Sequence, residues 1–391
     1  MENSIPVLPE ELVTEILSRL PVKSLLKFMC VSKSWLALIS SPEFVKTHLS
    51  LNANNNEYTC HKVMMFERTA YTFRDCSVSS LFNNSFRDCS VSSLFNNSSI
   101  RANNLDYPRQ VPCCFNMVGS VNGLICLVSQ LKEFFLWNPS IRKYKKLSDC
   151  KTKTNFVYSV YGFGYDEFHD DYKVVVIFII GRDDFSLQIE VKEYSLKIDS
   201  WRMVDNCPSI TPLQQSGMFV NGKLHWVSVI DLKQSIISFD LAYGKWGEME
   251  LPCYWKGGRG EVLSLGSDRL VFCDYDETYM LDVWLMKEYG VKESWMKMFT
   301  IKISKDQLVY GFLGQRRVHM ASGSEILVVF GSSFMIYNTK GDPLRSSKII
   351  EANNWDEAEI YIESLVCPFS TVGTEDATKM GLKSSGCGTM K

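Results

Sequence analysis

Residues 8–49 carry the strongest structural signal in this sequence, because residues that start and stop helices alternate there with apolar residues at helical spacing. Pro9 suits a first helical position, where its missing N–H costs nothing. Pro21 must end that helix, since a proline inside a helix costs roughly 3 kcal/mol. The sequence therefore predicts a first helix from Pro9 to Leu20.

Three more short helices are predicted in the same stretch. Apolar residues between Leu25 and Met29 form the second, Ser32 can cap the third, and Pro42 can open the fourth. So many large apolar residues in about 40 positions exceed what a core of that size can bury. We therefore expect a protein partner to cover part of this helical module.

Several short motifs in this module carry a family resemblance: Leu8-Pro9, Ile16-Leu17, Leu20-Pro21, Ser24-Leu25-Leu26, Val31-Ser32-Lys33 and Ser34-Trp35. With them the stretch resembles an F-box in the form common in plants. The resemblance implies a Skp-type adaptor as partner and, through it, a cullin and a RING subunit, so that the chain would be the substrate receptor of an SCF-type ubiquitin ligase. A generic helical hairpin is the alternative. The expected adaptor contacts are Leu8, Pro9, Ile16, Leu17, Leu20, Pro21, Leu25, Leu26, Val31 and Trp35.

The length of 391 residues predicts two folded units. We assign the helical module to residues 1–50, a polar, asparagine-rich linker to 51–62 and a β domain to 63–368. Residues 369–391 have lost apolar periodicity and are expected to be a disordered tail.

Short strands and turns recur from residue 118 onward, with no convincing long helix. An aromatic or bulky residue marks the end of each unit at intervals of 45 to 57 residues, near the ~40–50 residues of a propeller blade. The marks are Tyr144, Trp201, Trp246, Trp295 and Leu344. The predicted fold class is therefore N-terminal all-α helices followed by an all-β domain, a β-propeller of about six blades. An array of β-sandwiches is the alternative.

Motifs in these units carry a second resemblance: Asn122-Gly123-Leu124, Trp137-Asn138-Pro139, the run from Tyr161 to Asp166, and Gly222-Lys223-Leu224-His225-Trp226. They are similar to the plant F-box-associated domain of F-box/kelch-like proteins. True kelch repeats carry a Gly-Gly doublet in each blade, whereas only Gly257-Gly258 occurs here.

The segment Ser-Leu-Phe-Asn-Asn at residues 80–84 and the chain length resemble the S-locus F-box group. That resemblance implies recognition of non-self S-locus ribonucleases in pollen self-incompatibility. A generic plant F-box receptor for an unrelated protein target is the alternative. The same region holds a perfect tandem duplication, in which residues 73–85 are repeated at 86–98. We expect one copy to supply a strand and the other to be an insertion.

No constellation of catalytic or ligand-binding residues emerges. The five histidines fall in unrelated contexts, no paired His/Cys ligand spacing occurs, and the glycine-rich segments lack the other residues of a phosphate loop. His225 beside Trp226 is interpreted as a satisfied strand residue. We therefore predict a non-enzymatic protein without a cofactor or metal.

The net charge of -2 and the lack of a basic tract argue against nucleic-acid binding. The 13 scattered cysteines, with no C-x-x-C pair and no leader before the first helix, predict a reducing cytosol or nucleus. No membrane-spanning segment is expected, because the longest apolar run, 174–180, is a third of a bilayer span.

Acidic residues cluster between the predicted strands. Aspartate favours turns because it hydrogen-bonds its own backbone, and most of these clusters need no other explanation. If several converge on one face of the propeller, they would steer a basic protein partner. The candidate target-binding residues are Asp166, Glu167, Asp170, Asp171, Asp183 and Asp184.

Overall fold

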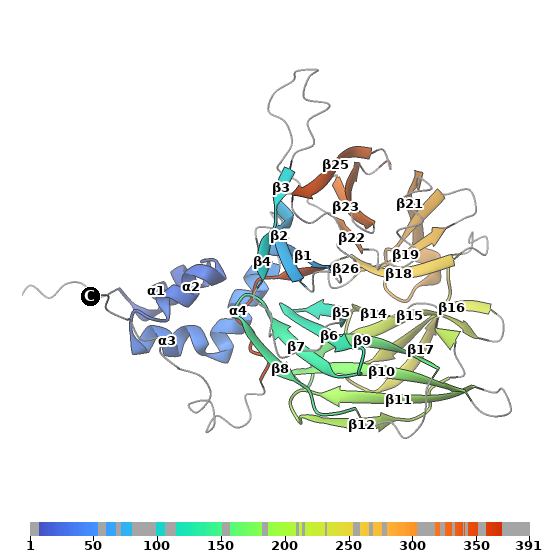
Figure 1. The fold of residues 1–391 in the computed structure, drawn as a ribbon, viewed down its shortest axis with the longest axis horizontal. Helices are drawn as coiled ribbons and strands as arrows, with labels where there is room; N and C mark the ends of the chain where they lie inside the picture. The colour runs from blue at the N-terminus through green and yellow to red at the C-terminus, as the bar shows by residue number, and fades with distance from the viewer. Residues whose placement is uncertain are drawn as a thin grey trace, which may run out of the picture.

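The computed structural model shows four helices packed at one side of a ring of β-sheets (Figure 1). The structure describes residues 8–53, 60–67, 72–79, 99–105, 115–150, 157–181, 187–208, 211–212, 216–230, 233–252, 259–265, 269–275, 280–302, 317–320, 325–330, 333–338, 340, 343–350 and 357–369.

The helical module contains α1 (Glu10–Ser18), α2 (Val22–Phe28), α3 (Lys33–Ser40) and α4 (Pro42–Ala53). Pro9 and Pro21 precede α1 and α2 as their N-caps, and the Ser32 hydroxyl accepts a hydrogen bond from the Trp35 backbone N–H at the start of α3. Ser32 and Pro42 thus stand at the helix starts predicted from the sequence, Pro9 lies one position before α1, and Pro21, which was predicted only to end the first helix, also precedes α2. Helix α4 continues to Ala53 and the first strand begins at His61, so both elements extend into the span predicted as a linker.

In the described residues, the β domain consists of six units, each built on four antiparallel strands. The first contains β26 (Glu357–Ile362), β1 (His61–Glu67), β2 (Thr72–Ser77) and β4 (Asn103–Leu105). The second contains β5 (Phe115–Val121), β6 (Leu124–Ser129), β7 (Phe134–Asn138) and β8 (Lys143–Lys146). The third contains β9 (Tyr158–Asp166), β10 (Asp171–Gly181), β11 (Leu187–Ser195) and β12 (Ser200–Val204).

The remaining three units follow the same antiparallel order. The fourth contains β14 (Ser216–Val220), β15 (Lys223–Ile230), β16 (Lys233–Asp240) and β17 (Lys245–Met249), with β13 (Thr211–Pro212) beside β15. The fifth contains β18 (Arg259–Leu265), β19 (Arg269–Tyr275), β20 (Met280–Met286), β21 (Trp295–Lys302) and the 3₁₀ turn η2 (Lys292–Ser294). The sixth contains β22 (Arg317–Met320), β23 (Glu325–Phe330), β24 (Ser333–Asn338), β25 (Pro343–Ile350) and, in parallel with β25, β3 (Ser99–Arg101).

The ends of the β domain close the ring. β26, close to the end of the chain, pairs antiparallel with β1, so the first unit combines strands from both ends of the β domain. β9 and β14, the first strands of two neighbouring units, pair in parallel through Tyr161 and Gly162 and join those units into a larger sheet. The aromatic and bulky marks predicted from the sequence fall in the fourth antiparallel strand of each unit: β8, β12, β17 and β21, which are outermost, and β25, which β3 flanks. The predicted propeller is therefore confirmed.

Apolar side chains between neighbouring units form the core. In the cluster between the third and fourth units, Trp226 is fully buried and donates its indole N–H to the Tyr161 carbonyl across the junction, at 3.1 Å. Gly217 is required there, because a Cβ at that position would stand 2.4 Å from the Trp226 ring.

The first copy of the duplicated segment supplies β2, which pairs with β1 and β4. Phe73, the first residue of that copy, stacks against Phe66 with ring centroids 4.5 Å apart. The second copy, residues 86–98, and the tail from residue 370 lie outside the described residues.

A short segment after β26, residues 363–367, fastens the helical module to the ring. Leu365 is buried in the core of the helical module, whereas the next residue, Val366, is buried in the core of the β domain. The side chain of Asn138 holds this segment by donating to the carbonyl oxygens of Ser364 (3.1 Å) and Val366 (2.8 Å). We call residues 363–367 the C-terminal latch.

Candidate functional site

The helical module exposes a set of large apolar side chains that its own core does not use. Ile16 is 54% exposed and Val31 is 62% exposed, although both belong to the predicted adaptor contacts. Leu8, Pro9 and Pro21 are exposed as well. Exposed apolar residues gathered on one small module are typical of a surface that a protein partner covers.

The other predicted contacts are less accessible. Leu20, Leu26 and Trp35 are half-buried and pack against the module core. Leu17 and Leu25 are fully buried in that core, so they hold the helices together and cannot touch a partner directly. Family motifs combine core and contact positions, and the sequence pattern did not separate them.

Three exposed leucines of the module were missing from the prediction: Leu12, Leu36 and Leu51. Leu12 lies four residues before Ile16, which places these two side chains on one side of α1. This spacing is visible in the sequence and could have identified Leu12.

The turn between α1 and α2 is fixed from α4. The ring of His48 is fully buried and its Nε2 lies 2.9 Å from the Leu20 carbonyl oxygen. Burial lowers the pKa of His48, and the hydrogen bond to Leu20 opposes that effect. The candidate contacts Leu20 and Pro21 are therefore carried by a rigid turn.

The acidic turn between β9 and β10 differs from the prediction. Its four carboxylates were predicted to bind the target, for which they would have to be exposed, but Asp166 and Asp171 are buried. That expectation is wrong for both residues, because backbone and side-chain donors around them make their carboxylates part of the fold. Asp171 accepts from the Ser195 hydroxyl at 2.5 Å and from the Lys197 backbone N–H at 2.8 Å.

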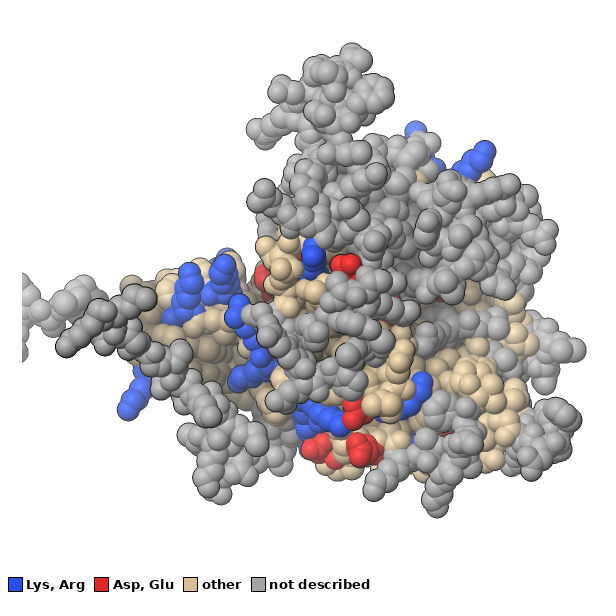
Figure 2. Space-filling model, viewed as in Figure 1, with Lys and Arg blue, Asp and Glu red and all other residues tan. Residues whose placement is uncertain are grey.

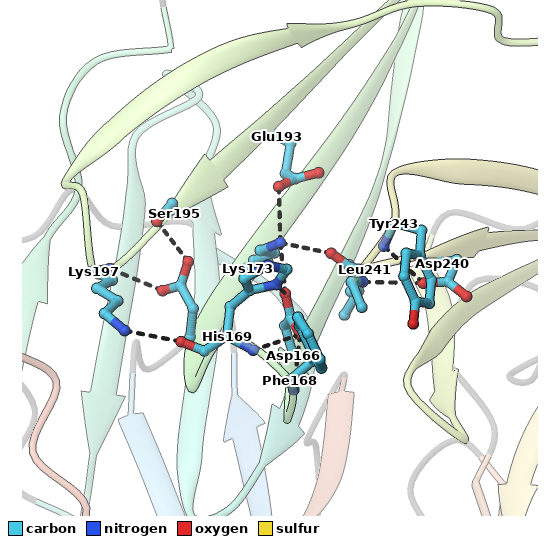
Figure 3. Close-up of polar contacts among 12 residues, drawn as sticks. Asp166, Phe168, His169, Lys173, Glu193, Ser195, Lys197, Asp240, Leu241 and Tyr243 are labelled. Carbon is cyan, nitrogen blue, oxygen red and sulfur yellow. Dashed lines mark hydrogen bonds and ion pairs between the residues drawn. The ribbon is translucent and has the colours of Figure 1, made fainter.

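Asp166 is the centre of a buried ionic network (Figure 3). The Lys173 ammonium lies 2.8 Å from Asp166 Oδ2 and 3.4 Å from Glu193 Oε1, and it donates to the Leu241 carbonyl at 2.5 Å. Burial by itself raises the pKa of Asp166, but hydrogen bonds from Lys173 and His169 outweigh it and hold that pKa below its ordinary value. Buried charges are tolerated when paired in this way.

The two remaining carboxylates of the turn are exposed, and one of them contacts the helical module. Asp170 forms an ion pair with Lys46 on α4, with 2.7 Å between Nζ and Oδ2. Hydrogen bonds from Lys46 and Tyr165 hold the pKa of Asp170 below its ordinary value. The turn therefore lies on the side of the ring that carries the helices, which we call the helix-bearing face. Asp183 and Asp184 lie outside the described residues.

Charge on the described part of the molecule is mixed. Figure 2 shows basic side chains on the helical module and near its junction with the ring, and acidic side chains close to the basic ones at the lower edge of that junction. Lys145 of β8, for example, pairs with Asp199 at 3.0 Å. Interleaved charges of both signs produce no strong field of one sign.

His225 is confirmed as a satisfied strand residue. It is fully buried, with Nδ1 3.2 Å from the Met218 carbonyl and Nε2 2.7 Å from the Tyr289 hydroxyl. Among the residues that the structure describes, no group of three or more His, Cys, Asp or Glu side chains could hold a metal ion. No helix in the described ranges is long and apolar enough to cross a membrane.

Comparisons with known proteins agree with the division into two units. Residues 5–47 match the family described as F-box domain, and residues 69–367 match the family described as F-box associated beta propeller domain. An F-box/kelch-repeat protein of Arabidopsis thaliana is 31% identical over 373 residues, covering 92% of this chain and 96% of the relative. F-box protein CPR1 of the same plant is 26% identical over 391 residues, covering 92% of this chain and 88% of the relative.

Among solved structures, TolB from Acinetobacter baumannii is similar with a TM-score of 0.45 and 9% identity, covering 81% of this chain and 70% of that protein. At that score the likeness supports no conclusion about either unit.

Proposed function

The chain belongs to the F-box proteins that carry an F-box associated beta propeller domain, and from that premise we propose that it is the substrate-recognition subunit of an SCF-type ubiquitin ligase. The helical module would bind a Skp-type adaptor and, through it, a cullin and a RING subunit. The propeller would bind the protein to be ubiquitinated, in the reducing cytosol or nucleus.

The observation that carries this proposal is that the helical module exposes a large apolar surface and is at the same time packed firmly against the propeller. Ile16 and Val31 project from a module whose core is already filled by Leu17 and Leu25. The C-terminal latch joins that module to the ring through Leu365. A target on the ring would thus be held at a fixed place relative to the adaptor.

The contribution of such a receptor to ubiquitin transfer is proximity. Holding target and ubiquitin carrier together converts a bimolecular encounter into an effectively intramolecular one. This role requires binding surfaces and rigidity and no reactive group on the chain itself.

The replacement Ile16→Asp tests the adaptor surface. Ile16 is exposed, so the variant should fold normally, but a carboxylate in an apolar contact should weaken adaptor binding by ~2 kcal/mol or more, about 30-fold. Binding is measured by calorimetry with purified adaptor, and urea denaturation checks the fold. Leu187→Asp, at a 53% exposed position on β11, is the matched control. Parent-like adaptor affinity in Ile16→Asp would reject this surface.

The narrower hypothesis of an S-locus ribonuclease as target rests on residues 80–84 and on chain length. Residues 80–84 lie outside the described residues. Affinity capture of the tagged chain from pollen and leaf extracts, with the proteasome inhibited, tests it. Recovery of a ribonuclease with the adaptor supports the narrow form, whereas adaptor with other proteins supports a receptor for an unrelated target.

A further inference from the structure

Three turns on the helix-bearing face each present one large apolar side chain to solvent. Phe168 in the β9–β10 turn and Ile198 in the β11–β12 turn are both 75% exposed, and Tyr243 in the β16–β17 turn is 70% exposed. We call these three residues the turn-tip surface. Single exposed apolar residues are common on soluble proteins, so their number alone decides nothing. The hydrogen bonds that hold the three turns in place are more informative about a binding role.

Each of the three turns is fixed by an aspartate carboxylate. Asp166 Oδ1 accepts from the backbone N–H groups of Phe168 and His169, both at 3.1 Å. Asp240 Oδ1 accepts from the backbone N–H groups of Ala242 and Tyr243, both at 3.0 Å. Asp171, at the start of β10, holds the β11–β12 turn from the neighbouring strand through the Lys197 N–H at 2.8 Å, and the Ile198 N–H donates to Ser195 Oγ at 3.1 Å. The backbone that carries each tip residue is therefore ordered by its own hydrogen bonds.

The turns are also tied to one another. Lys173 bonds both Asp166 in one turn and the Leu241 carbonyl in another, and thereby connects neighbouring units of the ring (Figure 3). Lys197 Nζ donates to the His169 carbonyl at 2.9 Å and connects the third turn. A surface ordered in advance loses little conformational entropy when a partner binds, which is how aromatic residues become binding hot spots.

Most of the carboxylates around the tips are paired with lysines, which leaves little net charge to attract a basic partner. Asp166 is paired with Lys173, Asp170 with Lys46, and Asp240 with Lys223 at 3.4 Å. Of the carboxylates that the sequence suggested for capturing a basic target, Asp166 and Asp170 are thus neutralised by lysines, whereas Glu167, beside Phe168, is exposed. The exposed aromatic rings distinguish this surface, and their faces offer apolar area on which aliphatic side chains can pack.

The ring spacing indicates the conformation of that partner. The centroids of Phe168 and Tyr243 are 6.4 Å apart with an interplanar angle of 33°. In an extended strand, side chains at alternate positions point the same way and are separated by roughly 6.6 Å. One aliphatic side chain can therefore meet each ring.

We propose that the turn-tip surface binds an extended, uncharged segment of the target protein that carries aliphatic side chains at alternate positions. This inference rests on the proposed function, because it names the kind of target segment that the propeller would take. Phe168 and Tyr243 are its anchors, and Ile198 extends the apolar surface from the adjoining turn.

The test uses three capped six-residue peptides as probes. One alternates serine and leucine, the second has the same composition with its leucines adjacent, and the third alternates serine and lysine. Binding to the full chain in complex with the adaptor is measured by calorimetry. We expect the alternating leucine peptide to bind more tightly than the other two. Phe168→Ala and Tyr243→Ala should each weaken it about tenfold or more.

Leu131→Ala is the matched control, since Leu131 is 72% exposed but lies in the β6–β7 turn. This variant should bind the alternating leucine peptide like the parent. Absence of binding, equal binding by all variants, no preference for the alternating register, or tighter binding of the lysine peptide would each overturn the proposal.

Adaptor affinity separates this proposal from the proposed function. Phe168→Ala and Tyr243→Ala should bind the adaptor like the parent, and a loss in either would make these residues an adaptor contact and overturn the assignment to the target. If Ile16→Asp retains adaptor binding, the adaptor surface of the proposed function fails, while the peptide result stands independently.

Discussion

Replacing Asn138 by alanine should release the C-terminal latch. The Asn138 side chain is fully buried and donates to Ser364 O and Oγ, both at 3.1 Å, and to Val366 O at 2.8 Å. Its Oδ1 accepts from the Ser140 N–H at 2.9 Å. The variant removes all four interactions and leaves buried carbonyls without donors. The amide NH₂ has two hydrogens, so at about 1 kcal/mol for each net hydrogen bond the two donated bonds and the accepted one correspond to a loss of ~3 kcal/mol in the free energy of unfolding.

The loss should be concentrated where the helical module meets the ring. Leu365 lies in the latch and in the core of the helical module, so loosening residues 363–367 should expose both. Urea denaturation gives the free energy of unfolding, and hydrogen exchange should show faster exchange in the latch and in α1 to α4 than in β9 to β12. Asn104→Ala, at an exposed position on β4, should change stability by no more than about 0.5 kcal/mol. A loss below ~1 kcal/mol for Asn138→Ala would refute the assignment of the latch.

Gly123→Ala should destabilise the chain by more than ~1 kcal/mol in urea denaturation, because φ is +82° there and a Cβ would stand 2.2 Å from Ser364 Oγ; parent-like stability would contradict this. Burial lowers the pKa of His225 to about 4, so the unfolded chain takes up a proton on this histidine at a higher pH than the folded chain does. The stability of the fold is therefore fully present above pH ~6.5, and up to about 3 kcal/mol of it should be lost as the pH falls to ~4. His61, whose pKa burial also lowers to about 4, acts in the same direction. The variant His225→Gln should therefore reduce the slope of stability against pH without removing it, and an unchanged slope would show that His225 does not cause this pH dependence. Deleting residues 86–98 should leave the melting temperature within a few degrees of the parent, since the first copy supplies β2, and a large fall would show that both copies are needed.

Much of the fold could be predicted from local sequence features. Pro9, Pro21 and Ser32 begin helices wherever they occur in such a pattern, because backbone geometry and capping are local effects. The recurrence of Trp201, Trp246 and Trp295 indicated one supersecondary unit per interval, and all three lie in outermost strands.

The candidate sites were predicted less completely, because burial depends on what packs against a residue. Leu17 and Leu25 belong to the same motifs as Ile16 and Val31, yet only the last two are available to a partner. Phe168 and Tyr243 are 75 positions apart in the sequence, and nothing local indicates that their rings lie 6.4 Å apart.

The sequence by itself determined the presence of the helices, the period of the strands and the family, since these depend on residues close together in the chain. Only the tertiary structure decided the roles of the carboxylates and of the latch. Asp166 and Glu167 are neighbours with the same chemistry, but Lys173 and the backbone around it bury the first as part of the fold and leave the second in solvent. Asn138 likewise acquires its role from Ser364 and Val366, more than 200 residues away. Interactions between distant segments form only when the ring closes, so no local pattern could carry them.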